Sequence, residues 1–499
     1  MMTIYLNNQF HYETENLVRL FFPNDTIRVI REQPQEKELP LITVLTQEQA
    51  DRTVVSVTVE TEDFCESASA VTEGDPRTHE KDVERDMAVC LYGLLVRLTG
   101  REQPWGILTG VRPIKLFRRL TDKGGRDYAE RYFSEKLLVS EEKVRLSSLT
   151  EQYEKRILAL SQPLSFSLYV SIPFCPTRCS YCSFVSQSIE SARKLIQPYF
   201  EKLLEEITAT AQIARNCHLR LESVYIGGGT PTTLSAVQLQ TLIETIRSCF
   251  DMTTCREFTV EAGRPDTIDE DKLRAILTGG ADRISINPQT LNDRVLEVIG
   301  RKHTSAQTLE AYRLAREVGF RHINMDLIAG LPTEDVESFR RTLDTLCGLA
   351  PESITVHTLA MKRSSRLTMQ KTAVSTGSEP PAAGMLRYCE QKLTAENYHP
   401  YYLYRQTRME GNLENVGWSK QGYDGLYNVF IMDETHTILG CGAGAVSKLK
   451  KPASEDLERI FNYKYPYEYI NGFSEMLNRK ERVTSFYAEL AEYISQIRL

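Results

Sequence analysis

Alternating apolar strands and amphipathic helices dominate the middle of the 499-residue chain. Between about residues 165 and 360, short apolar runs such as SLYVSIP, SVYIGG and HINMDLIAG alternate with helical stretches such as TLEAYRLAREVGF. Strands joined by crossover helices are parallel, and their connections are right-handed. About six such units predict an α/β fold, either an open doubly wound sheet or a full or partial barrel, with ligands at the carboxyl ends of the strands.

The segments on either side of this repeat have different patterns. Residues 1–160 combine extended runs such as RTVVSVTVE with an amphipathic helix that starts near Val83, and they predict a separate N-terminal α/β domain. Residues 366–499 mix helical and extended runs and predict an α+β region. With the repeat at 161–365, the sequence predicts three parts, because the chain is too long for one hydrophobic core.

Composition and charge exclude several classes of protein. A hydrophobic content of 41% and a charged content of 25% are typical of a globular chain. The net charge of -7 argues against non-specific binding to nucleic acid. No apolar run approaches the roughly 18 residues needed to cross a bilayer, and the start of the chain lacks the features of a signal peptide. We therefore expect a cytoplasmic protein without a transmembrane segment or a nucleic-acid partner.

Three of the eleven cysteines lie together. Cys175, Cys179 and Cys182 form a C-x3-C-x2-C run just after the first strand of the repeat, and three ligands from one loop suit a metal centre. A structural zinc needs four ligands, and His218 and His303 are isolated in sequence. The spacing therefore favours an iron–sulfur cluster with one open iron, and zinc remains the alternative. The other eight cysteines are scattered singly along the chain, and we expect them to be small core residues. They are Cys65, Cys90, Cys217, Cys249, Cys255, Cys347, Cys389 and Cys441.

A glycine-rich turn, Gly227-Gly228-Gly229-Thr230-Pro231-Thr232, ends the second strand. Consecutive glycines let the backbone approach a ligand where a Cβ would collide. The alternative is a tight strand-to-helix turn in which Pro231 opens the next helix. Because the turn lacks the G-x-G-x-x-G spacing and the lysine of a phosphate loop, it does not predict a nucleotide phosphate site.

Together, Y-V-S-I-P-F-C-x3-C-x-Y-C and G-G-G-T-P-T resemble the radical S-adenosylmethionine (SAM) superfamily, and within it the oxygen-independent coproporphyrinogen III oxidase (dehydrogenase) family. The resemblance runs from about Tyr169 to Ser447, and the long N-terminal extension resembles a longer subgroup of that family. It implies a partial (β/α)6 TIM-like barrel and a C-terminal region that covers the substrate site. It also implies that Cys175, Cys179 and Cys182 hold a [4Fe-4S] cluster whose open iron binds SAM.

The resemblance implies further residues around SAM. The positions that match contacts to the cluster-bound molecule are Tyr169, Gly228, Gly229, Glu261, Ala360 and Val446. The positions that match the surroundings of a second SAM are Tyr181, Thr230, Gln289, Arg301 and Asp326. Polar groups at strand ends would supply the donors and acceptors that SAM needs, and the candidate catalytic set is Tyr169, Glu261, Gln289, Arg301 and Asp326. Each residue taken alone also has a structural interpretation. Glu261 or Asp326 would cap a helix or form an ion pair, and Arg301 would be a surface cation.

The family's chemistry, as the resemblance implies it, begins with one electron from the reduced cluster, supplied by a donor such as flavodoxin or ferredoxin. Cleavage of SAM then gives a radical that removes hydrogen from a propionate of coproporphyrinogen III. Loss of carbon dioxide and an electron leaves a vinyl group, and two rounds give protoporphyrinogen IX for haem biosynthesis. A tetrapyrrole with four carboxylates requires cations. Candidates are Arg112, Lys115, Arg118, Arg119, Arg301, Lys302, Arg405 and Arg408, although a solvated helix face also explains the first four.

Two departures keep other functions open. Phe184 stands where the characterised decarboxylase has a fourth cysteine, and the haem-chaperone branch shares this pattern. The chaperone's H-N-x-x-Y-W pattern is degraded, because Gly411 precedes Asn412 and Asn415 and Val416 replace the aromatic pair. The sequence therefore predicts a radical SAM oxidoreductase acting on coproporphyrinogen III. A haem-binding or haem-delivering protein and an enzyme that methylates or degrades haem are alternatives.

Overall fold

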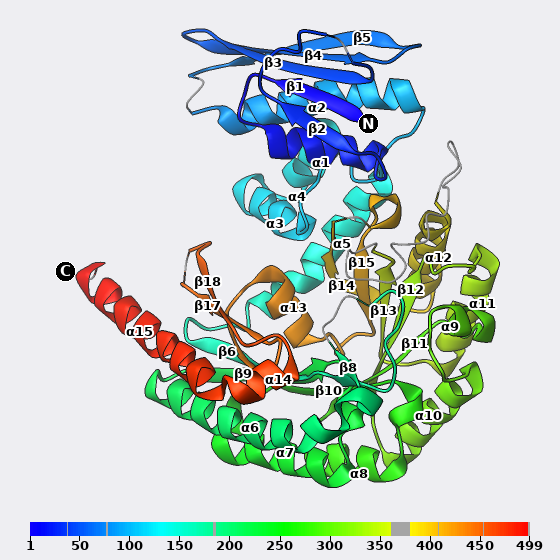
Figure 1. The fold of residues 1–499 in the computed structure, drawn as a ribbon, viewed down its shortest axis with the longest axis vertical. Helices are drawn as coiled ribbons and strands as arrows, with labels where there is room; N and C mark the ends of the chain where they lie inside the picture. Colours follow the sequence, from blue (N-terminus) through cyan, green and yellow to red (C-terminus); the bar gives the residue numbers. More distant parts are fainter. Residues whose placement is uncertain are drawn as a thin grey trace. The chain divides into compact units, whose positions relative to one another are not determined.

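The computed structural model describes residues 1–36, 38–75, 78–182, 186–360, 380–407, 409–452 and 454–497. They form two compact units (Figure 1). The N-terminal unit consists of Met1–Glu151, Lys371–Ala383 and Tyr404–Glu414, and the barrel unit consists of Gln152–Gln370, Gly384–Leu403 and Asn415–Leu499. The boundaries at 160/161 and 365/366 stay a prediction. No helix among the described residues is long and apolar enough to cross a membrane.

A five-stranded sheet and two helices build most of the N-terminal unit. The strand order is β2-β1-β3-β4-β5, parallel between β2, β1 and β3 and antiparallel from β3 to β5. The strands are β1 (Met2–Leu6), β2 (Ile27–Ile30), β3 (Leu41–Glu48), β4 (Arg52–Glu60) and β5 (Cys65–Glu73). Figure 1 shows α1 (His11–Phe21) and α2 (Glu80–Thr99) on one face, where alternate valines of β4 are buried. The predicted N-terminal α/β sheet is confirmed.

The chain between this sheet and the barrel unit is largely helical. After α2 come α3 (Pro113–Gly124), α4 (Arg126–Arg131), a π-helical turn (Tyr132–Lys136) and α5 (Glu141–Leu158), which continues into the barrel unit.

An eleven-stranded sheet organises the barrel unit, in the order β14-β15-β13-β12-β11-β10-β9-β6-β16-β17-β18. Its six central strands are all parallel to one another. They are β6 (Ser165–Ile172), β9 (Arg220–Gly228), β10 (Glu257–Gly263), β11 (Arg283–Gln289), β12 (His322–Ala329) and β13 (Ser353–Thr358). The six-strand parallel core expected from the sequence is thus confirmed.

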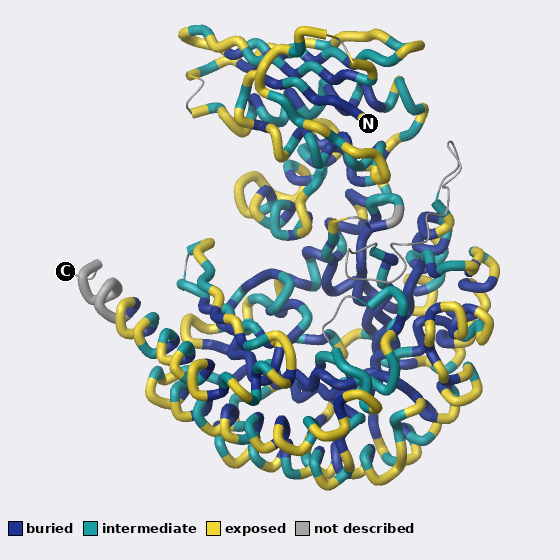
Figure 2. Tube along the Cα trace, in the orientation of Figure 1, coloured by how far each residue is buried: buried dark blue, intermediate teal, exposed yellow. Residues whose placement is uncertain are grey.

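The helices between these strands lie on the outer side of the sheet (Figure 1), so the fold is a partial barrel and not a doubly wound sheet. They are α6 (Ile189–Asn216), α7 (Ala236–Cys249), α8 (Glu270–Thr278), α9 (Asp293–Val298), α10 (Ser305–Val318) and α11 (Val336–Leu349). Two of them begin with a full capping box, at Ser235 and Thr304. Figure 2 shows buried strands inside an arc of helices whose outer sides are exposed.

Later parts of the chain extend both edges of the same sheet. β15 pairs antiparallel with β13, while β16 pairs in parallel with β6 and continues antiparallel to β17 and β18. The later strands are β14 (His399–Tyr404), β15 (Asn415–Ser419), β16 (Thr437–Cys441), β17 (Val446–Lys450) and β18 (Leu457–Phe461). The later helices are α12 (Pro381–Ala395), α13 (Leu426–Asp433), α14 (Pro466–Asn471) and α15 (Phe473–Ile497).

A buried ion pair fixes α15 to the barrel. Lys480 Nζ lies 2.9 Å from Glu206 Oε1 on α6 and donates to the carbonyl of Gly440 at 2.6 Å. The other carboxylate oxygen of Glu206 accepts from the backbone N–H of Gly442 at 2.7 Å and from the Tyr469 hydroxyl at 2.5 Å. The carboxylate therefore ties α6, α15 and the turn after β16 together.

We expect Lys480→Met to destabilise the barrel unit. The substitution leaves the Glu206 carboxylate buried without its cation, and breaking a buried pair in this way costs about 3–5 kcal/mol. Urea unfolding followed by circular dichroism should show the loss. The neighbouring exposed Glu481→Gln also removes one charge but should change the free energy of unfolding by less than about 0.5 kcal/mol. Equal stability of the two variants would contradict the role assigned to the pair.

Candidate active site

The three-cysteine loop leaves the carboxyl end of β6. Cys179 is buried, and Cys175 and Cys182 are half-buried; all three are free thiols. The loop is held by backbone contacts: the N–H of Cys182 donates to the carbonyl of Cys179 at 3.3 Å, and that of Ser180 donates to the carbonyl of Ile299 at 3.0 Å. A short parallel pair, β7 (Phe174–Cys175) and β8 (Gln187–Ser188), closes its base. Phe184 lies outside the described residues.

The glycine-rich turn packs directly against this loop. The backbone N–H groups of Gly229 and Thr230 donate to the carbonyls of Ile172 and Phe174, and the Thr230 hydroxyl lies 3.6 Å from Cys175 Sγ. A Cβ on Gly229 would lie 2.6 Å from the Phe174 carbonyl and 3.0 Å from Cys175 Sγ. Only glycine allows this close approach. Burial raises the pKa of the Cys175 thiol, against hydrogen bonds from Ser186 and Thr230.

Polar side chains form two hydrogen-bonded groups on the inner wall of the barrel. The Tyr225 hydroxyl donates to Glu261 Oε1 at 2.5 Å, and the Asn324 amide donates to Ser285 at 3.0 Å and to Asp326 at 2.7 Å. The Thr355 hydroxyl donates to Asn324 Oδ1 at 3.1 Å. We call these residues, with His357, the interior polar chain.

The pKa values of Glu261 and Asp326, the two carboxylates among these residues, are shifted in opposite directions. Burial and the nearby charge of Asp326 raise the pKa of Glu261 to about 7, although the hydrogen bond from Tyr225 opposes the shift. Burial also acts to raise the pKa of Asp326, but the contact with His357 and the hydrogen bond from Asn324 outweigh it and the pKa is lowered. His357 Nε2 lies 3.8 Å from Asp326 Oδ2. At neutral pH, Asp326 is therefore ionised and Glu261 is close to its midpoint.

Three tyrosines stack beside Glu261. The ring centroids of Tyr225 and Tyr427 lie 4.4 Å apart, and Tyr169 stacks on the same pair with centroids 6.4 and 6.1 Å away. Burial, together with the charge of Glu261, raises the pKa of Tyr169. The stack gives this side of the barrel an aromatic wall.

A second group brings Tyr181 and Arg301 together. Arg301 donates from Nη2 to the Tyr181 hydroxyl at 3.0 Å and from Nη1 to the carbonyl of Asn287 at 2.7 Å. Arg301 Nε and Gln289 Oε1 are buried, and neither has a hydrogen-bond partner among the described residues. Gln289 also has a φ of 67°, which is uncommon for a residue other than glycine. Unpaired buried polar atoms of this kind are what a polar ligand would satisfy.

The remaining predicted residues occupy the ends of the barrel sheet. Ala360 follows β13 and is half-buried, and Val446 is the half-buried first residue of β17. The turn before Val446 lies beside the end of β6, because the Ser171 hydroxyl donates to the carbonyl of Ala443 at 2.8 Å.

The proposed carboxylate-binding cations separate between the units. Arg112, Lys115, Arg118, Arg119 and Arg405 belong to the N-terminal unit, Arg301 and exposed Lys302 belong to the barrel unit, and Arg408 lies outside the described residues. Arg405 is buried, and its Nη atoms donate to the carbonyl of Leu108 and to Asn412. These donors are therefore engaged within the protein.

The degraded haem-chaperone pattern has a structural role here. Glu414, within that stretch, accepts hydrogen bonds from Trp105 Nε1 at 2.8 Å and from Lys143 Nζ at 2.7 Å. Asn412 accepts from Arg405, and Asn415 accepts from the backbone N–H of Thr358. The polar side chains at these positions hold the protein's own backbone and charged groups.

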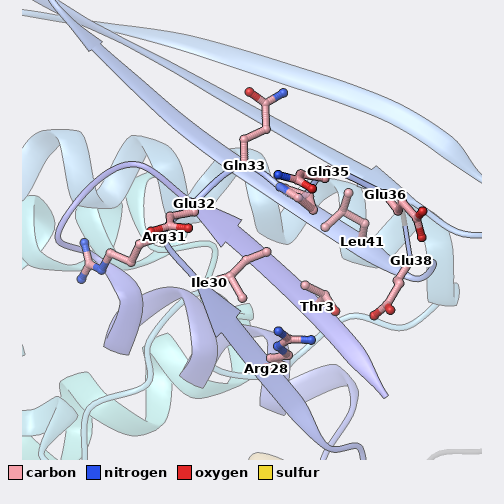
Figure 3. A pocket seen from close by; sticks show the side chains of 11 residues that line it. Thr3, Arg28, Ile30, Arg31, Glu32, Gln33, Gln35, Glu36, Glu38 and Leu41 are labelled. Atoms are coloured by element: carbon pink, nitrogen blue, oxygen red, sulfur yellow. The ribbon is translucent and has the colours of Figure 1, made fainter.

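A cavity of about 680 Å³ lies elsewhere, in the N-terminal unit. Figure 3 shows lining side chains from strands, Thr3, Arg28, Ile30 and Leu41, together with side chains from residues 31–36 and Glu38 between β2 and β3. None of the predicted site residues lines it.

The residues at the cysteine loop fit a [4Fe-4S] cluster. Among the described residues, no three His, Cys, Asp or Glu side chains are grouped as ligands of a single metal ion. A four-iron cluster instead takes each thiolate on a different iron, so its ligands are spread around it. Because residue 229 is a glycine, it has no Cβ to crowd Cys175 Sγ. The unpaired polar atoms of Gln289 and Arg301 suit the polar groups of SAM.

Comparison with known proteins matches the chain to a family model and to curated relatives. Residues 169–346 match the family model of the radical SAM superfamily. The chain is 35% identical over 482 residues to the "oxygen-independent coproporphyrinogen-III oxidase-like protein HemZ" of Bacillus subtilis (strain 168), covering 95% of each chain. It is 32% identical over 264 residues to the "heme chaperone HemW" of the same organism, covering 52% of this chain and 68% of that protein.

Among solved structures, the chain is similar to coproporphyrinogen III oxidase (HemN) from Escherichia coli, a radical SAM enzyme, with a TM-score of 0.51. The identity is 24%, with 66% of this chain and 73% of that chain covered, so the likeness shows the fold alone. The fold and the family match define a radical SAM protein. The chain belongs to the radical SAM superfamily and, within it, to the oxygen-independent coproporphyrinogen III oxidase-like family. The predicted resemblance is confirmed, and the family implies a [4Fe-4S] cluster and SAM.

Sequence reasoning missed Tyr225 and His357. Both occupy the inward-facing alternate positions of predicted strands, SVYIGG and SITVHTLA, so strand alternation was a signal that could have found them. The third ring of the stack, Tyr427, comes from α13, for which the sequence offered no comparable pattern.

We expect Glu261→Gln to flatten the pH dependence of stability. Between its ordinary pKa of 4.5 and about 7, Glu261 keeps a proton that the unfolded chain loses. The native state then binds more protons, so the free energy of unfolding falls as pH rises, by up to about 3 kcal/mol. Urea unfolding at pH 5 and pH 8 should show a smaller fall in the variant. The exposed Glu244→Gln on α7 serves as the control, and an unchanged slope in Glu261→Gln would refute the assignment.

Proposed function

We propose that this protein oxidatively decarboxylates propionate side chains of coproporphyrinogen III to vinyl groups, giving protoporphyrinogen IX in anaerobic haem biosynthesis. The observation that carries the proposal is the position of the cysteine loop and the glycine turn at the carboxyl end of the strands that hold the interior polar chain. The similarity to the oxidase-like protein HemZ along nearly the whole chain supports the choice of substrate class.

Each thiolate of Cys175, Cys179 and Cys182 would bind one iron of the cluster. When bound, the cluster and SAM supply a one-electron reductive cleavage that generates a radical able to remove hydrogen from a C–H bond. Every other task belongs to the protein. The backbone of Gly228 and Gly229 would contact the amino-acid part of SAM. The Glu261 carboxylate would accept a hydrogen bond from a hydroxyl of SAM in place of the one it now accepts from Tyr225.

The tyrosine stack would exclude water from the radical. Tyr169, Tyr225 and Tyr427 present ring faces on one side of the barrel, and their raised pKa values keep all three hydroxyls protonated. A dry, aromatic wall limits the side reactions open to a reactive carbon centre.

Arg301, Gln289 and His357 supply polar groups for a second ligand. Arg301 Nε and Gln289 Oε1 are unpaired among the described residues, and His357 is half-buried beside Asp326. Arg301 Nε and the ring N–H of His357 can donate to anionic oxygens, which both a second SAM and a tetrapyrrole carry, whereas Gln289 Oε1 can only accept, for example from an amine or a pyrrole N–H. A one-electron donor of the flavodoxin or ferredoxin class would reduce the cluster.

Haem binding is the second candidate function, favoured by the 32% identity to the heme chaperone HemW over half of the chain. The side chains of Asn412 and Glu414 already form hydrogen bonds within the protein, which argues against a haem ligand at the positions of the chaperone's motif. Purified protein that binds haem stoichiometrically would support this alternative.

The direct test is an anaerobic incubation of reconstituted protein with dithionite, SAM and coproporphyrinogen III. We expect 5′-deoxyadenosine together with tetrapyrroles that have lost one or two carbon dioxide units, both detected by mass spectrometry. Cys179→Ala should abolish both products and lower the iron content, because it removes a cluster ligand. The matched control is Cys217→Ala, a half-buried cysteine outside the loop, which should keep full iron and activity.

Two other outcomes separate the alternatives. Formation of 5′-deoxyadenosine with an unchanged tetrapyrrole would reject coproporphyrinogen III as the substrate but retain radical chemistry. A methylated or ring-opened haem product would instead identify an enzyme that modifies haem.

A further inference from the structure

A buried arginine that the sequence analysis did not single out lies beside the cysteine loop. Arg264 follows β10 directly, and its side chain is only 4% exposed. Its guanidinium donates from Nε and Nη2 to the two carboxylate oxygens of Asp266, at 2.9 and 2.8 Å. Such a two-point contact fixes the plane of the guanidinium as well as its position.

The remaining nitrogen of Arg264 points at the loop. Nη1 donates to the Thr177 hydroxyl at 2.8 Å and lies 3.9 Å from Cys179 Sγ. Thr177 in turn donates to the carbonyl of Gly300 at 3.2 Å. Arg264 is therefore the link between the end of β10 and the segment that carries Cys175 and Cys179.

Two other ionisable side chains lie near this point. Arg301 also interacts electrostatically with Cys179, but its Nη donors go to Tyr181 and to the backbone of Asn287. His303 Nδ1 lies 3.8 Å from Asp266, and burial lowers its pKa, so its ring is neutral at pH 7. Arg264, oriented by Asp266, is thus a cation aimed at the sulfur of Cys179.

We propose that Arg264 sets the reduction potential of the iron–sulfur cluster through its contact with Cys179, an inference that rests on the cluster ligands given under Proposed function. A hydrogen bond or a positive charge at a ligand sulfur stabilises the additional electron of the reduced cluster. The step is the transfer of one electron from a flavodoxin-class donor, or dithionite, to the cluster. No bond forms or breaks at Arg264, and it keeps its proton.

The ion pair between Arg264 and Asp266 allows a test in which two variants should shift the midpoint potential in opposite directions. Arg264→Met removes the cation and the donor at similar volume, so the midpoint potential should become more negative. Asp266→Asn removes the counter-charge while an amide oxygen can still accept from Arg264, so the potential should become less negative. Arg264→Lys keeps the charge and should lie between the unmodified protein and Arg264→Met. We expect each of the two main shifts to approach a tenfold change in the ratio of reduced to oxidised cluster, which is about 59 mV for one electron.

The measurement is a redox titration of the anaerobically reconstituted full chain, without substrate, followed by electron paramagnetic resonance of the reduced cluster. Iron and sulfide analysis establishes that each variant carries the same cluster. The control is Arg274→Met on α8, an exposed arginine paired with Glu270, which removes one charge away from the loop and should leave the potential unchanged.

Each outcome decides the inference. Opposite shifts in Arg264→Met and Asp266→Asn support it, whereas an unchanged potential or shifts of the same sign in fully loaded protein overturn it. If Arg264→Met does not retain the cluster, the potentials of Arg264→Lys and Asp266→Asn test the role of Arg264 instead. A potential of Asp266→Asn equal to or more negative than that of the unmodified protein rejects this role. Failure of the unmodified protein to bind a cluster would instead reject the ligand assignment, and the two failures are distinguishable.

Discussion

Period-two alternation along six parallel strands determines where the polar side chains of the site lie. In each strand, one set of side chains packs on the helices and is mostly apolar, as in Ile284 and Ile286 of β11, while the other set faces the barrel interior. A register shift of one residue would exchange the two sets, so the apolar packing under the helices also fixes Glu261 and Asp326 inside. The stability of the fold and the geometry of the site therefore depend on the same pairing.

The interior contains polar groups of two kinds. Near the amino ends of the strands, Glu257 and Arg283 form a buried pair, and Glu257 also accepts from the N–H groups that open α13. These charges are satisfied within the protein and serve its structure. Near the carboxyl ends, Gln289 and Arg301 retain buried polar atoms without partners among the described residues. The contrast separates the supporting end of the barrel from the end that receives ligands.

Much of the fold was predictable because its determinants are local. The six strands of the barrel and the α2 helix follow from residue periodicity, and the cysteine loop and glycine turn follow from short motifs. The pairs that complete the site are not local. Arg264 meets a loop 85 positions earlier, and Glu206 meets Gly442 at a separation of 236 positions. No periodicity encodes such contacts. The sequence therefore predicted which strands carry the candidate site residues, but not which distant residues contact them.

The pairing of β16 with β6 has a consequence for the order in which the protein is made. Ser171, beside the cysteine loop, bonds to Ala443, which is synthesised 272 positions later. The edge of β6 that pairs with β16 therefore stays open on the ribosome while the intervening helices are translated. Contacts of such long range also slow folding. The nascent chain thus has an extended interval in which one edge of its central parallel sheet is unpaired and open to association with other strands.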